Sequence, residues 1–137
     1  MDWKLELIVV PVSDVDRAKS FYLEQFGFEL IVDHSPNESF RIVQLVPPGS
    51  ACAIAFGIGV QSSEPGTMKG LHLVVTDIDE ARAQLVGRGA EPSELFHFEA
   101  GGQAPGPDPA RADYNTFFSL ADPDGNMWLV QEVGRAS

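Results

Sequence analysis

The sequence predicts an α+β fold in which two βαβββ modules follow one another within a single domain. Two observations carry this prediction: the segment at 12–21 recurs at 75–84, and each copy is followed by three strand-like runs. The modules are expected at about residues 4–57 and 70–133, with a polar connector at 58–69. The length of 137 residues suits one domain and is too short for two ordinary ones.

The repeated segment predicts the first helix of each module. VSDVDRAKSF at 12–21 matches VTDIDEARAQ at 75–84, and in both copies an apolar strand-like run leads into an aspartate. Asp14 and Asp77 are placed to cap the free N–H groups of the helices that follow. In the first module the apolar residues keep a helical spacing until Gly27, which is placed to end the helix.

Three strand-like runs follow each predicted helix, rich in β-branched and aromatic residues. The six runs are FELIVDH (28–34), FRIVQLV (40–46), ACAIAFG (51–57), PSELFHF (92–98), NTFFSLA (115–121) and MWLVQEV (127–133). Between the runs at 92–98 and 115–121, residues 99–113 hold three Gly and three Pro without apolar periodicity. This segment is expected to be a loop, either a lid over a pocket or an irregular surface segment.

Charge and composition limit the classes of partner. Acidic residues outnumber basic ones 20 to 9, which gives a net charge of −11 and argues against nucleic-acid binding. The same charge favours cationic partners, although it also serves solubility. No signal peptide or membrane-spanning stretch is visible, and the single Cys52 allows no internal disulfide. We therefore expect a cytoplasmic protein that binds neither nucleic acid nor membranes.

Two motifs give the sequence a family resemblance. The DVDRAKSFY segment after the first strand and the DPDGN turn before the last one together resemble the vicinal oxygen chelate superfamily. That superfamily contains glyoxalase I, extradiol dioxygenases and bleomycin-resistance proteins, and the resemblance extends from about Leu5 to Val133. It implies a cup-shaped mixed sheet with the helices on the outside, and a homodimer.

The resemblance also implies where a metal would be held. In the superfamily His, Gln or Glu ligands come from the first and last strands of each half. The matching positions here are Leu7, Gly70, Leu129, and either Ala53 or Ala55. None of these side chains can donate a nitrogen or oxygen to a divalent metal, so no metal or other cofactor is expected.

A shifted metal site is the alternative. His72 lies two residues beyond Gly70 and Gln131 two beyond Leu129, each on the same strand face as the expected position. Gln44 or His97 would have to complete such a site. A glyoxalase-like lyase or isomerase, or a dioxygenase, would then be possible. A metal-free enzyme that uses His72 as general base is a further alternative, because histidine exchanges protons near neutral pH.

Strand alternation predicts a mostly apolar pocket with a few polar groups, which is typical of a small-molecule site. The expected lining residues are Leu7, Val9, Gln44, Ala53, Ala55, His72, His97, Tyr114, Leu129 and Gln131. The favoured function is binding of a small organic molecule, cationic or aromatic, as in bleomycin-resistance proteins. A module whose pocket is filled by its own side chains, with His72 as a structural imidazole, remains a third possibility.

Overall fold

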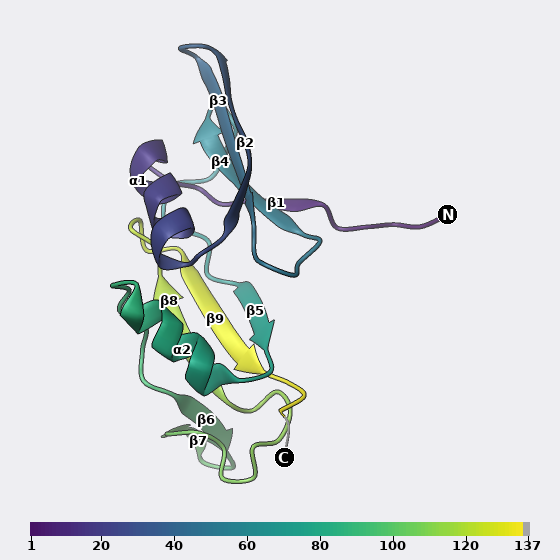
Figure 1. Ribbon diagram of the computed structural model, residues 1–137, viewed down its shortest axis with the longest axis vertical. Coiled ribbons are helices and arrows are strands. Elements are labelled where there is room, and N and C mark those ends of the chain that lie inside the picture. Colours follow the sequence, from purple (N-terminus) through teal and green to yellow (C-terminus); the bar gives the residue numbers. More distant parts are fainter. Residues whose placement is uncertain (136–137) are drawn as a thin grey trace. The chain divides into compact units, whose positions relative to one another are not determined.

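The computed structural model describes residues 1–135 and shows an α+β fold of two compact units (Figure 1). The first unit contains residues 1–68 and 122–126, and the second contains 69–121 and 127–135 among the described residues. Each unit has one sheet and one helical segment, so the predicted fold class of two strand–helix modules is confirmed. Among the described residues, no helix has the length and apolar character needed to cross a membrane.

The sheet of the first unit has the strand order β1-β4-β3-β2. Its strands are β1 (Leu7–Val9), β2 (Glu29–Asn37), β3 (Phe40–Val46) and β4 (Ala53–Ile58). β1 runs parallel to β4, and the two other pairs are antiparallel. The parallel pair follows from the helical crossover between β1 and the rest of the module.

The first helical segment begins and ends as the sequence predicts but changes type on the way. α1 (Val15–Ser20) is capped by Asp14, whose side chain accepts a hydrogen bond from Arg17 N at 3.0 Å. It continues as a π-helical turn, η1 (Phe21–Gln25), closed by a 3.0 Å bond from Phe26 N to Phe21 O. Gly27 ends the segment with a φ of 78°, a left-handed conformation that favours glycine.

An aromatic cluster forms the core between this helical segment and its sheet. Tyr22 stacks on Phe26 with ring centroids 5.9 Å apart, and its ring lies 5.8 Å from that of Phe56 on β4. Phe28 completes the cluster at 4.7 Å from Phe26. All four residues are buried, so one face of this sheet is closed by aromatic packing.

The turn at Asp122–Asn126 belongs to the first unit, where it binds the helical segment. Tyr22 donates its hydroxyl proton to Asp122 Oδ2 at 2.8 Å, and both residues are buried. Asn126 donates to Pro11 O at 2.7 Å and accepts from Met68 N at 3.1 Å. The two motifs that carry the family resemblance are thus joined by a buried hydrogen bond.

The sheet of the second unit has the strand order β5-β9-β8-β6-β7. Its strands are β5 (Leu71–Val75), β6 (Phe96–Glu99), β7 (Gly102–Pro105), β8 (Phe117–Ala121) and β9 (Met127–Glu132). The helix α2 (Ile78–Gly87) is capped by Asp77, which accepts from Glu80 N at 3.1 Å. This cap repeats that of the first unit, as the internal repeat predicts.

One face of this sheet packs against α2. Trp128, Val130 and Glu132 of β9 are buried and alternate with half-buried neighbours. Glu132 accepts a hydrogen bond from Ile78 N at the start of α2, which fixes the helix on the side of these three residues. Leu129 and Gln131 therefore point to the helix-free face.

The strand β7 corrects the expectation that 99–113 is a loop throughout. Residues 102–105 pair with β6 in a tight hairpin, with Glu99 opposite Gly102 and Phe96 opposite Pro105. Backbone pairing needs no side-chain alternation, and proline is tolerated here because β7 is an edge strand. The second unit therefore has one strand more than a βαβββ module.

Candidate functional site

In the first unit the predicted residues share one face of the sheet. Strand pairing places Leu7 beside Ala53, Val9 beside Ala55, and Ala55 beside Gln44. This is the face opposite the aromatic core, because Ile54 and Phe56 point the other way. Both alanines are buried and small, and Gln44 is half-buried and supplies the amide group of this face.

In the second unit a row of polar groups crosses the helix-free face. His72 pairs with Leu129, and Leu129 pairs with Ser119 on the next strand. Gln131 lies two residues beyond Leu129 and pairs with Val74. His72 and Gln131 are therefore diagonal neighbours on one face, as the sequence predicts for this pair. Together with Ser119, these two residues offer an imidazole, an amide and a hydroxyl for hydrogen bonds with a ligand.

An aromatic cluster extends the same face toward β8 and β6. Gln131 lies opposite Phe117, and Phe117 lies opposite Phe96. The Phe96 and Phe117 rings stack at 5.6 Å with an interplanar angle of 25°, and Phe98 meets Phe117 edge-on at 5.6 Å. Phe98 keeps 49% of its surface exposed. We call Phe96, Phe98 and Phe117 the aromatic platform; such rings can stack on a planar ligand.

A groove of about 400 Å³ lies next to the platform. Its lining includes Phe96, Ser119, Gln103 and Pro105. This volume lies within the range of small-molecule pockets. The groove thus connects Phe96 of the platform with Ser119 of the polar row.

His97 does not join the other predicted site residues. It lies between Phe96 and Phe98 on β6, so strand alternation directs its side chain to the opposite face. It is 4% exposed, and its Nδ1 lies 2.8 Å from Gly106 O. The expectation that His97 lines the pocket is thus not met, because the platform phenylalanines occupy the other face of β6.

Tyr114 precedes β8 and lies next to the last residue of β9. Its backbone N–H donates to Glu132 O at 3.0 Å, its φ is 64°, and its side chain is exposed. The preceding residues 106–113 are fixed by Asp108, which accepts from Ala112 N at 2.9 Å, and by Arg111, which contacts Glu132 at 3.2 Å. The part of the Gly/Pro segment that follows β7 is therefore anchored to the second unit.

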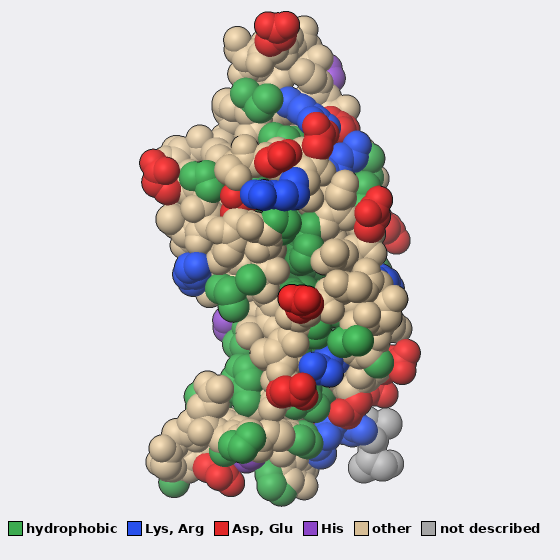
Figure 2. Space-filling model, turned by 90° about the vertical axis from the view of Figure 1, so that its left-hand side faces the viewer, with side chains coloured by type: hydrophobic (Ala, Val, Ile, Leu, Met, Phe, Trp, Pro, Cys, Tyr) green, Lys and Arg blue, Asp and Glu red, His purple; other side chains and the backbone are tan. Residues whose placement is uncertain are grey.

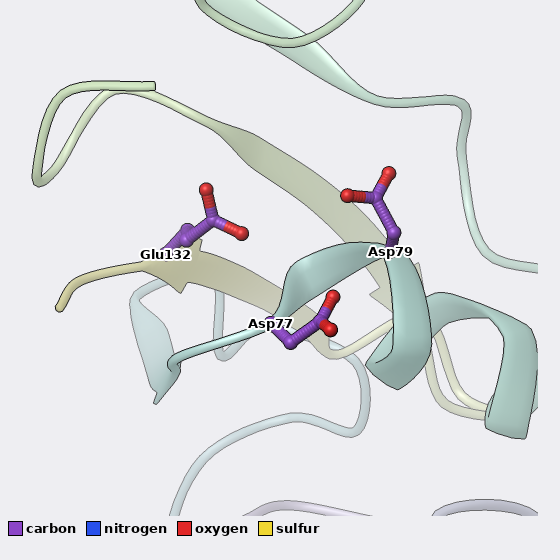
Figure 3. A group of neighbouring side chains, drawn as sticks. All are labelled: Asp77, Asp79 and Glu132. Carbon is purple, nitrogen blue, oxygen red and sulfur yellow. The ribbon is translucent and has the colours of Figure 1, made fainter. Parts of the chain in front are cut away.

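Three carboxylates meet at the N-terminal end of α2. The side chains of Asp77, Asp79 and Glu132 offer oxygen atoms within 4.8 Å of one another, and Figure 3 shows that two come from the start of α2 and one from β9. Such a group could bind a cation in principle. Here the Arg111 guanidinium contacts Asp79 and Glu132, and Arg135 lies 2.9 Å from Glu132 and 3.1 Å from Asp79.

The two arginines make this group an ion-pair network. Burial raises the pKa of Glu132, but the Ile78 N–H and the guanidiniums of Arg111 and Arg135 lower it more, so the net pKa is below its usual range. The pKa of Asp79 is likewise lowered, chiefly by its hydrogen bond with Arg111. In the space-filling view of Figure 2, acidic and basic side chains lie next to one another at several points of the visible face. The network holds α2 to β9.

Comparison with known proteins settles the family. The model of the Glyoxalase/Bleomycin resistance protein/Dioxygenase superfamily matches residues 4–130. The chain belongs to this superfamily. Its fold and its two motifs agree with the match, so the resemblance seen in the sequence is confirmed.

Solved structures and one curated relative extend the comparison. TnmS3, an antibiotic binding protein from Streptomyces sp. CB03234, is 29% identical, with 96% of each chain covered and a TM-score of 0.73. A superfamily member from Sphaerobacter thermophilus DSM 20745 is 28% identical, with 96% of this chain and 98% of that one covered and a TM-score of 0.72. The uncharacterized protein YetH of Bacillus subtilis (strain 168) is 24% identical over 125 residues, 91% of this chain and 94% of its own.

The aromatic platform is the part of the site that sequence reasoning missed. The signal was present, because Phe96 and Phe98 alternate along β6 in phase with each other, and Phe117 begins β8. Their strand pairing, which brings β6 beside β8, could not be read from either run alone. Glu132 carried a second signal, since it is a carboxylate in phase with the buried Trp128 and Val130.

Proposed function

We propose that this protein binds a small organic compound, aromatic or cationic, and sequesters it without chemical change. The observation that carries the proposal is the helix-free face of the second sheet. There the aromatic platform adjoins Ser119 and Gln131, and His72 lies on the same face one strand beyond Gln131. An apolar surface with a few placed polar groups is the usual composition of a ligand site.

Two further facts support this proposal. TnmS3, with 29% identity over nearly the whole chain, is an antibiotic binding protein. The net charge of −11 would draw cationic compounds toward the protein through long-range attraction. Neither fact names the compound, and both fit binding better than any particular reaction.

We propose that the site works without a metal. The family positions are occupied by Leu7, Gly70, Leu129 and the alanines of β4, which offer no side-chain donor atom. Of the residues considered for a shifted site, only His72 and Gln131 share a face within the second unit, while His97 points to the other face. Two donors hold a divalent metal poorly. Metal analysis by plasma mass spectrometry on protein purified without chelator or affinity tag tests this, and a stoichiometric transition metal would contradict it.

We also propose that the protein acts in the cytoplasm as a homodimer. The dimer is what the family resemblance implies, and the free, half-buried Cys52 suits a reducing compartment. Sedimentation equilibrium on the full chain tests the dimer directly. A mass equal to one chain at micromolar concentration would contradict it.

Calorimetric titration against cationic and planar aromatic compounds, with bleomycin and ethidium among them, tests binding itself. We expect at least one dissociation constant in the micromolar range. His72→Ala should weaken that binding about tenfold, since a hydrogen bond to a buried ligand group contributes about 1.5 kcal/mol. Val86→Ala, on the exposed side of α2, is the matched control and should leave it unchanged. A panel without any micromolar binder would refute the proposal.

A further inference from the structure

His97 is a buried titratable group directly behind the aromatic platform. It occupies the middle of β6, and its neighbours Phe96 and Phe98 point to the opposite face of the sheet. Only 4% of its surface is exposed. Any change in how His97 is held is therefore transmitted to the strand that carries two of the three platform rings.

The two ring nitrogens of His97 are held unequally. Nδ1 lies 2.8 Å from Gly106 O, so it carries a proton and donates it across the hairpin to the residue after β7. Nε2 lies 3.4 Å from Glu99 Oε2 and has no hydrogen-bond partner among residues 1–135. A buried polar atom without a partner is unfavourable. When Nε2 is protonated, the ring can join Gly106 and Glu99 at the same time.

The charges around the ring favour the protonated state. Glu99 on the same strand and Asp108 in the segment after β7 are both acidic. On the side of α2, Asp79 and Arg82 line a groove beside Gly106, but Arg82 is engaged by Ser93 O at 2.8 Å. The carbonyl of Gly106 and the two carboxylates outweigh burial, and the pKa of His97 is raised.

We propose that His97 is a positioning residue for the ligand site, which in its protonated state joins Gly106 to Glu99 and thereby fixes the β6–β7 hairpin under Phe96 and Phe98. The proposal rests on the function proposed above. It adds that ligand affinity depends on pH through a residue that does not touch the ligand. Binding is tighter when His97 is protonated, because the platform rings are then already in place.

The direction of the pH effect follows from the contacts of His97. Because the protonated ring holds the hairpin in its binding form, affinity is lost as the pH rises through the pKa of His97, which lies above the ordinary 6.5. Affinity for a platform ligand should therefore be higher at pH 6 than at pH 8. We expect a difference of at least about fivefold, the lower end of typical coupling between two sites.

The first test is an NMR titration of the full chain, which needs no ligand. The His97 imidazole signal and the backbone amides of Phe96 and Phe98 should follow one midpoint. In His97→Asn, which keeps a donor for Gly106 O and does not titrate, these amides should lose that midpoint. His34→Asn removes an exposed histidine of the first unit and should change nothing. Amides that ignore the His97 midpoint would overturn the proposal.

The second test measures ethidium binding at pH 6 and pH 8. It is made in a His72→Gln background, because His72 carries an imidazole on the platform face itself. The pH dependence should persist in that background, vanish on adding His97→Asn, and shift to lower pH on adding Glu99→Gln. Binding that is equally strong at both pH values would refute the role of His97 while leaving the proposed function intact. Absence of binding by any compound would refute the proposed function, and the NMR titration would then decide alone.

Discussion

The hydrogen bond from Tyr22 to Asp122 should be a main support of the first unit. Tyr22→Phe removes the hydroxyl but keeps the ring that packs against Phe26, Phe28 and Phe56, so it leaves no cavity. A hydrogen bond to a charged group contributes about 1.5–3 kcal/mol. We expect the lower end of this range, because Asp122 Oδ2 also accepts from Asn126 at 2.8 Å and is not left unpaired.

Urea unfolding followed by circular dichroism measures this loss. A cost of about 1.5–2 kcal/mol divided by a typical urea slope of about 2 kcal/mol per molar lowers the midpoint by about 1 M. Tyr114→Phe is the matched control, since its exposed hydroxyl should change the free energy of unfolding by less than about 0.5 kcal/mol. If the urea midpoints of both variants equal that of the wild type, the buried hydrogen bond between the two motifs does not stabilise the first unit.

Two further predictions concern buried positions. Glu132→Gln should lower the free energy of unfolding by about 2 kcal/mol at pH 7, because it leaves two arginines without their shared buried carboxylate. Both arginines are partly exposed, which keeps the loss small. The pKa of Glu132 lies below 4.5 in the folded protein, so its carboxylate stabilises the fold fully above pH 4.5. The difference in free energy of unfolding between wild type and variant should therefore disappear as the pH falls further. Gly57→Ala should destabilise by about 2 kcal/mol or more, because a Cβ there would lie 1.8 Å from Arg41 O, whereas Gly101→Ala, with open space around it, should be nearly neutral in the same unfolding assay.

Local patterns predicted the elements of this fold well. Asp14 and Asp77 cap their helices as expected, and the run at 40–46 coincides with β3. The alternation that placed Gln44 on the face of Ala53 is likewise confirmed by the pairing of Gln44 with Ala55. These features depend on residues close in sequence, where capping and alternation determine the outcome.

Contacts between distant residues could not be predicted in the same way. Tyr22 and Asp122 are 100 positions apart, and nothing in either motif indicates its partner. The strand β7 was missed because its Gly/Pro-rich sequence lacks the alternation that marks a strand. His97 was expected among the lining residues, but the alternation of its own strand directs it to the other face. The phase of Phe96 and Phe98 shows the correct side.

We propose the helix-free face of the second sheet as the ligand site. An NMR titration of the wild-type protein with the cationic and aromatic panel tests it most directly, because each backbone amide reports its own surroundings. We predict that the largest shifts fall on Phe96, Phe98, Phe117, Ser119 and Gln131, and that they shrink in Phe98→Ala. Shifts confined to α2, or no shift with any compound at millimolar concentration, would contradict the account.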